Sequence, residues 1–117
     1  MSRILIVDDE KRIRRIYRDL LASFGFLVEE AATADQANEI VKHEKVDLVL
    51  LDIKMPEAGG DSLFEVMSLF HRDMKVIVTS VYPLDVQRRM VAGAHDYYDK
   101  SQGIRVLLTK IRQVLDN

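Results

Sequence analysis

The sequence of 117 residues contains no cysteine, which excludes a disulfide framework, a thiolate metal site and a cysteine nucleophile. It also lacks a long hydrophobic segment, since no run approaches the roughly 20 apolar residues that span a membrane. The opening segment has four consecutive apolar residues, Ile4 to Val7, before two acidic ones, which is not the pattern of a signal peptide. We therefore expect a soluble, cytoplasmic protein.

An excess of charge of either sign is also missing. The chain has 17 basic and 19 acidic residues and a net charge of −2, a balance that offers no strongly basic surface. We therefore expect no direct nucleic-acid or membrane partner. The hydrophobic share of 48% and the charged share of 31% suit an ordinary folded core. The length fits a single domain over residues 1–117.

Two kinds of apolar segment alternate along the chain. Short β-rich runs predict strands, and apolar residues at three- and four-residue intervals predict amphipathic helices. Such alternation is typical of a doubly wound parallel sheet with right-handed crossovers and helices on both faces. We therefore expect the α/β class, with a five-stranded sheet flanked by five helices. The expected strands are 4–7, 27–31, 46–51, 75–79 and 95–99, and the expected helices lie within 13–24, 33–41, 63–70, 83–92 and 104–115.

Local signals add detail to three of these elements. Thr33 with Gln36 three residues later matches a capping box that opens the second helix. Two glutamates interrupt the strand at 27–31, and an edge position would tolerate them. In the fourth helix Leu84, Met90 and Val91 are expected to point inward.

The first helix carries a run of basic residues that includes Arg14, with Arg18 following it. Most of these charges fit a solvated polar face. We interpret most of the charges of this run, which comprises Lys11, Arg12, Arg14, Arg15 and Arg18, as solvated.

Polar side chains occur at the carboxyl ends of four expected strands. Asp8 and Asp9 follow the first strand, Asp52 the third and Lys100 the fifth, and Thr79 ends the fourth. Ligands bind at this edge of open α/β sheets. Three close carboxylates repel one another unless a cation lies among them, and oxygen ligands favour Mg²⁺. With a lysine and a hydroxyl, this set has the parts that phosphoryl transfer requires, and aspartate is a known nucleophile toward phosphorus.

Each of these residues also has an ordinary structural explanation. Asp8 or Asp9 alone fits an N-cap of the first helix, and Asp52 alone fits the start of a turn. Thr79 alone fits a β-former, and Lys100 alone fits solvated surface. These separate explanations do not account for the charged strand ends sharing one edge, so we favour a common site.

Four segments of the chain resemble the receiver domain of bacterial response regulators. They are ILIVDDE at 4–10, DIKMP at 52–56 with Gly60, VTS at 78–80 and GAHDYYDK at 93–100, in the order and spacing of that family. The resemblance covers essentially the whole chain. It implies a flavodoxin-like fold with strand order 2-1-3-4-5 and a receiver module of a two-component or phosphorelay signalling system.

The resemblance implies that Asp52 is the phosphoacceptor. Its phosphate would come from a phosphohistidine on a histidine kinase or a histidine phosphotransfer protein. The implied cofactor is Mg²⁺, bound directly by Asp9 and Asp52, largely through water by Asp8, and by the backbone carbonyl of Lys54. The implied product is a phosphoprotein. In this family the first helix, which carries the basic run here, is a usual docking surface for kinase helices.

The remaining implied roles concern phosphoryl recognition and switching. Thr79 and Lys100 would stabilise the phosphoryl group, and the small Ser80 would leave access to it. Thr79 and Tyr97 would form the switch, changing the helix 4–strand 5–helix 5 surface that engages an output partner. Tyr98 is expected to point to the face opposite Tyr97, since strand side chains alternate.

One departure from the family follows Lys100, where proline is usual, often in a cis bond. This chain has Ser101, and a non-proline cis bond costs about 2.5–4 kcal/mol. We therefore expect either a trans Lys100–Ser101 bond with a reshaped loop or a strained cis bond. As another alternative, Ser101 caps the last helix.

Two other functions stay open from the sequence. A Mg²⁺-dependent phosphohydrolase would need a second carboxylate two residues beyond its nucleophile, where this chain has Lys54 after Asp52 or Glu10 after Asp8. A receiver-like interaction module that is never phosphorylated is the second alternative. We favour the receiver and expect no enzyme beyond reactions of its own Asp52. Its expected state is a monomer or a phosphorylation-dependent dimer, with an unknown downstream protein or output domain.

Overall fold

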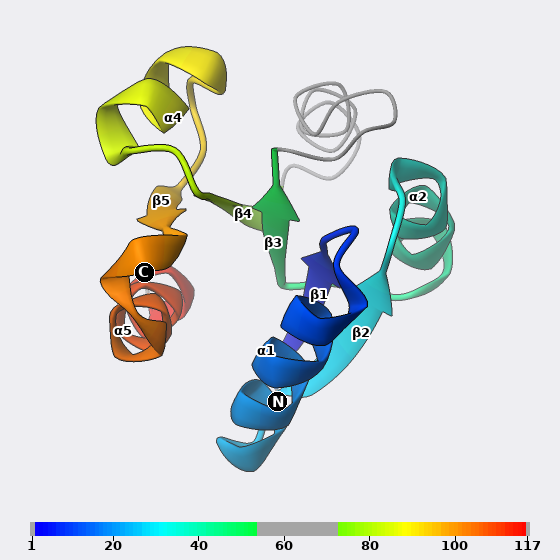
Figure 1. Cartoon of the computed structure of the whole chain (residues 1–117). Helices are drawn as coiled ribbons and strands as arrows, with labels where there is room; N and C mark the ends of the chain where they lie inside the picture. The colour runs from blue at the N-terminus through cyan, green and yellow to red at the C-terminus, as the bar shows by residue number, and fades with distance from the viewer. Residues whose placement is uncertain (1, 54–72, 117) are drawn as a thin grey trace.

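The computed structural model of the chain describes residues 2–53 and 73–116. Five strands form one parallel sheet in the order β2-β1-β3-β4-β5 (Figure 1), which confirms the expected fold class and strand order. The strands are β1 (Arg3–Val7), β2 (Leu27–Ala31), β3 (Leu48–Asp52), β4 (Lys75–Ser80) and β5 (Asp96–Asp99).

Four α-helices and one short turn accompany the sheet in the described ranges. They are α1 (Lys11–Ser23), α2 (Ala34–His43), α4 (Leu84–Met90), α5 (Ile104–Asp116) and the 3-10 turn η1 (Lys100–Gln102). The helix expected within 63–70 lies outside the described residues. Of the helices described, none is long and apolar enough to cross a membrane.

The central strands β1 and β3 are buried on both faces of the sheet, because helices cover each face (Figure 1). Alternation along the strands sorts their side chains into two clusters. The cluster on the α2 and α4 face includes Leu5, Val7, Val49 and Leu51. The cluster on the α1 and α5 face includes Ile4, Ile6, Leu48 and Leu50. This two-sided burial explains why both strands are nearly continuous apolar runs.

The edges of the sheet agree with two further expectations. Strand β2 lies at one edge, where the partly buried Glu29 and Glu30 are tolerated. Strand β5 forms the other edge. There Tyr97 belongs to the α2 and α4 face and Tyr98 to the α1 and α5 face, so the two tyrosines do point in opposite directions.

The helix signals were correct at α2 and partly wrong at α4. The Thr33 side chain accepts a hydrogen bond from the main-chain N–H of Gln36 at 3.1 Å, which confirms the cap of α2. In α4, Val91 is buried at its C-terminal end as expected, but Met90 is 48% exposed. The inward position there is taken by Gln87, which is 0% exposed. Gln87 lies four residues before Val91 and therefore shares its face of the helix.

His95 joins the start of β5 to β4. Its main-chain N–H donates to the carbonyl of Val76 at 2.9 Å, and its Nδ1 accepts from the N–H of Val76 at 3.1 Å. The second bond requires an unprotonated Nδ1. Partial burial, followed by the charge of Lys75, lowers the pKa of His95 below its ordinary value. The folded protein therefore favours neutral His95.

We expect His95 to make stability depend on pH in the weakly acidic range. The stability linked to its lowered pKa is present above the ordinary pKa and is lost as the pH falls through the lowered one, because the unfolded chain takes up the proton first. His95→Asn keeps an acceptor that does not titrate. Its urea midpoint should fall less than that of the native chain between about pH 7.5 and pH 5. Equal falls in both proteins would contradict this role of His95.

Candidate functional site

Asp8 follows β1 directly and is held by its main chain and its side chain. Its N–H donates to the carbonyl of Ala31 at 3.1 Å, and its own carbonyl accepts from Nη1 of Arg14 at 2.7 Å. Its Oδ1 accepts from the N–H of Glu10 at 2.9 Å. The residue is only 1% exposed. These contacts fix the orientation of the Asp8 carboxylate at the carboxyl edge of the sheet.

Lys100 brings the ends of three strands together. Its Nζ lies 3.0 Å from Oδ2 of Asp8 and 3.4 Å from Oδ2 of Asp52. Asp52 ends β3 and is 2% exposed. Burial alone would lower the pKa of Lys100, but the charges of Asp52 and Asp8 outweigh it and raise that pKa. The lysine therefore stays protonated and neutralises part of the charge of the two buried carboxylates.

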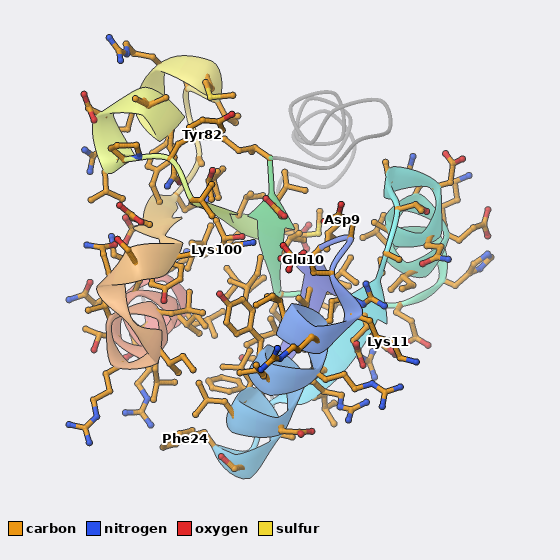
Figure 2. All side chains as sticks on the ribbon, viewed as in Figure 1. Asp9, Glu10, Lys11, Phe24, Tyr82 and Lys100 are labelled. Atoms are coloured by element: carbon orange, nitrogen blue, oxygen red, sulfur yellow. The ribbon has the colours of Figure 1, made fainter. Side chains whose placement is uncertain are left out.

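The acidic residues after β1 form a compact group of oxygen ligands. One carboxylate oxygen from each of Asp8, Asp9 and Glu10 lies within 4.8 Å of the others. Figure 2 shows Asp9 and Glu10 on the loop after β1, with Lys100 entering from the end of β5. A donor set made only of carboxylate oxygens fits a small, hard divalent cation. Glu10 was not among the expected ligands, although its position after two aspartates was a signal for it.

The N-cap explanation of the two aspartates does not hold. Residue Glu10 occupies the N-cap of α1, and its side chain makes no capping hydrogen bond. Asp8 instead accepts from the main chain of Glu10 and from Lys100. Asp9 is exposed and belongs to the oxygen group. The arrangement is that of a polar site rather than a helix cap.

Thr79 lies beside Asp52 in the sheet. The two residues are partners in the parallel register of β3 and β4, and Thr79 is 2% exposed. Ser80 follows and is fully buried, and its Oγ accepts from the N–H of Tyr82 at 3.1 Å. The structure therefore brings Asp8, Asp52, Thr79 and Lys100 to one edge, with a small residue next to Thr79.

Tyr97 lies apart from this group, in the core near α4. Its hydroxyl donates to the carbonyl of Val91 and accepts from the N–H of Ala94 at 3.3 Å. The guanidinium of Arg88 lies 5.6 Å from the centre of its ring. Its switching role stays a prediction, as does the ligand role of Lys54, which lies outside the described residues.

The segment after β5 settles the alternatives at Ser101. The Lys100–Ser101 bond is trans, since the described residues contain no cis peptide bond. Asp99 caps the turn η1, because its Oδ1 accepts from the N–H of Ser101 at 2.9 Å and from its hydroxyl at 2.8 Å. The side chain of Gln102 in turn accepts from the N–H of Asp99 at 3.1 Å. Ser101 is therefore part of η1 and does not cap α5.

Arg14 makes contacts that were not expected from the sequence. Its side chain is 13% exposed, and its Nε lies 3.3 Å from Oε1 of Glu30 in β2. Nη1 of Arg18 lies 3.0 Å from the other oxygen of Glu30. The interpretation as a solvated face is therefore wrong for Arg14, which joins β2 to the main chain of Asp8. The sequence did contain a signal, because Glu30 lies in an expected strand, where a carboxylate needs a basic partner such as Arg14.

Comparison with known proteins identifies relatives over nearly the whole chain. Residues 4–112 match the family described as the response regulator receiver domain. The transcriptional regulatory protein CpxR of Escherichia coli (strain K12) is 31% identical over 116 residues, which cover 98% of this chain and 50% of CpxR. CpxR of Klebsiella pneumoniae is 33% identical with the same coverage. The chain thus spans about half the length of the curated relatives it matches.

Solved structures with the same fold are also similar in sequence. A CheY-like receiver domain protein from Methanospirillum hungatei JF-1 has a TM-score of 0.90 and 36% identity, covering 99% of this chain and 94% of its own. TrrA from Thermotoga maritima, solved in complex with Mg²⁺ and BeF, has a TM-score of 0.88 and 30% identity, covering 98% and 100%. The structure of the histidine kinase ThkA in complex with TrrA matches with a TM-score of 0.85 and 30% identity. The match covers 98% of this chain and 99% of that chain.

Proposed function

The chain belongs to the family of response regulator receiver domains, and on this premise we propose that it is a phosphoacceptor module whose acceptor is Asp52. The observation that carries the proposal is the placement of Asp52 at the sheet edge. Its carboxylate is buried there, 3.4 Å from a lysine ammonium that also binds Asp8. Asp52 is the acid in this group that ends the central strand β3.

In the proposed reaction, a carboxylate oxygen of Asp52 attacks the phosphorus of a phosphohistidine in line with the leaving nitrogen. A P–O bond forms, the P–N bond breaks, and the imidazole nitrogen keeps the electron pair. The Lys100 ammonium is already within reach of Asp52 and pairs with a phosphoryl oxygen. Thr79, next to Asp52 in the sheet, offers its hydroxyl to another. The chain thereby promotes the phosphorylation of its own Asp52, and the proposal includes no turnover of other phosphoesters.

A divalent cation completes this proposal. The carboxylates of Asp8, Asp9 and Asp52 and the carbonyl of Lys54 would hold Mg²⁺, with Glu10 beside them. When bound, Mg²⁺ supplies positive charge for the phosphoryl oxygens. In the structure, the ammonium of Lys100 contacts both Asp8 and Asp52. TrrA, a relative at 30% identity, is described in complex with Mg²⁺ and BeF, which supports this choice of ion.

The proposed partner is a histidine kinase or a histidine phosphotransfer protein. The complex of TrrA with the kinase ThkA supports this class of partner. The curated relatives are transcriptional regulators about twice as long as this chain, so an output protein or domain belongs to the proposal. Phosphorylation would act through Thr79 and Tyr97 on the surface formed by α4, β5 and α5.

We expect one phosphate per chain after incubation with Mg²⁺ and acetyl phosphate, measured by intact mass. The adduct should be stable in acid and labile in base, as an acyl phosphate is. Asp52→Asn should abolish it, because an amide is not a nucleophile toward phosphorus. Asp85→Asn, at an exposed aspartate of α4, should leave it unchanged.

Three results would contradict this proposal. An adduct that persists in Asp52→Asn would place the phosphate on another residue. A native chain that never gains a phosphate would be an interaction module without phosphorylation. Rapid turnover of varied phosphoesters would indicate a phosphohydrolase.

A further inference from the structure

Gln87 is a buried polar residue whose side chain contacts two separate elements. It lies in α4 and is 0% exposed. Its Nε2 donates to the carbonyl of Tyr82 at 2.8 Å and to the carbonyl of Tyr98 at 3.0 Å. Tyr82 belongs to the loop between β4 and α4, and Tyr98 belongs to β5. One carboxamide thus holds the loop, the helix and the edge strand together.

The two carbonyls are close in sequence to the residues of the candidate site. Tyr82 donates its N–H to Oγ of Ser80, which directly follows Thr79. Tyr98 is the register partner of Thr79 in the sheet and comes two residues before Lys100. Figure 2 labels Tyr82 before α4 and Lys100 after β5. The bonds of Gln87 therefore connect the main chain after Thr79 with the main chain that leads to Lys100.

The orientation of the Gln87 carboxamide is fixed by its surroundings. The opposite orientation would place the side-chain oxygen against two carbonyl oxygens. All three are acceptors, so no hydrogen bond could form between them. In the orientation present, Oε1 is buried and has no hydrogen-bond partner among the described residues. A buried acceptor without a partner is unfavourable, and an apolar side chain would avoid that cost. The two hydrogen bonds donated by Nε2 offset this cost.

We propose that Gln87 is a positioning residue that couples the loop after Thr79 to the end of β5. The inference rests on the proposed function, in which phosphate on Asp52 draws Thr79 toward it. Ser80 and Tyr82 follow Thr79 along the chain, and Gln87 passes their displacement to Tyr98. The surface of α4, β5 and α5 then responds to Asp52 through hydrogen bonds to main-chain atoms, in addition to any movement of Tyr97.

The test uses the whole chain labelled with ¹⁵N, to which Mg²⁺ and beryllofluoride are added as a phosphate analogue. In the native chain the amide resonances of Thr79 and Tyr98 should both shift. In Gln87→Met, which keeps the length of the side chain and removes its donor, Thr79 should shift as in the native chain. The shift of the Tyr98 amide should fall to less than about half of its value in the native chain, because a coupling contact is lost.

Lys110→Met is the matched control. Lys110 also donates to a carbonyl of β5, that of Tyr97, but does so from α5 and without a bond to the β4–α4 loop. The control should keep the native shift at Tyr98. A full Tyr98 shift in Gln87→Met, or an equal loss in Lys110→Met, would overturn the coupling role of Gln87.

A measurement on the native chain covers the case in which Gln87→Met does not fold. The side-chain amide resonances of Gln87 should shift together with those of Thr79 when beryllofluoride binds. Unchanged Gln87 resonances beside shifted Thr79 and Tyr98 would overturn the inference. If beryllofluoride shifts nothing in the native chain, the proposed function itself fails, and the two failures are thereby distinguished.

Discussion

Replacing Lys100 by methionine is expected to lower the free energy of unfolding by about 3 kcal/mol at neutral pH without Mg²⁺. Methionine keeps much of the length of the side chain but has no charge. It would leave Asp8 and Asp52 close together without their shared cation, with side chains 2% and 3% exposed. The value lies at the low end for broken buried ion pairs, because the Lys100 side chain is itself 14% exposed. Urea denaturation in EDTA, followed by circular dichroism, measures the loss.

A double-mutant cycle tests the cause of this loss. Asp52→Asn removes one of the two negative charges, so Lys100→Met should cost less in that background than in the native chain. Added Mg²⁺ should stabilise Lys100→Met more than the native chain, because the ion would replace the missing charge. A loss below about 1 kcal/mol would show that these ion pairs behave like solvated surface pairs. An equal loss in both backgrounds would show that Asp52 is not the partner that matters.

Most of the fold was readable from the sequence because each expected strand has its own local pattern. The apolar runs of β1 and β3 are continuous, which reflects burial on both faces of the sheet. The strand order could not be predicted in this way, since pairing between distant segments leaves no trace in local periodicity. That order came from the family resemblance. At α4 the periodicity was right for Leu84 and Val91, which pack in the core. It was wrong for Met90, which is exposed, and it did not indicate the buried polar Gln87.

The site was predictable where side chains meet side chains. Parallel strands share a carboxyl edge, which was enough to bring Asp8, Asp52 and Lys100 together. Bonds that a side chain donates to a main-chain carbonyl outside a capping motif were not predictable, since every residue has a carbonyl and its identity says nothing about its partner. Arg14 and Gln87 both act on carbonyls, and both were missed.

The turn after Lys100 was an intermediate case. Asp99 and Gln102 have the three-residue spacing of a capping box, and the structure contains both of its hydrogen bonds. That signal favours the trans form of the Lys100–Ser101 bond, although the missing proline alone leaves both forms open. Gly103, with a φ of 93°, then ends the turn in a region that favours glycine.

Arg14→Met is expected to weaken Mg²⁺ binding about tenfold, because groups that orient metal ligands contribute that much to affinity. Arg14 donates to the carbonyl of Asp8 at 2.7 Å, and Asp8 begins the acidic group after β1. Without this donor the loop loses one of the bonds that fix Asp8, so the carboxylates must be ordered when the ion binds. Titration of the chain with Mg²⁺ alone, by calorimetry, measures the change without any phosphate.

Arg18→Met is the matched control for this prediction. Both arginines of α1 pair with Glu30 in β2, Arg14 at 3.3 Å and Arg18 at 3.0 Å. Either replacement therefore removes one cation that pairs with Glu30. Of the two, Arg14 is the one that donates to the main chain of Asp8. An affinity that falls in Arg14→Met and holds in Arg18→Met assigns the effect to that bond. Loss of a positive charge alone would raise the affinity for Mg²⁺. Equal falls would therefore assign the effect to the pairing with Glu30 that both variants lose, and would contradict a positioning role of Arg14.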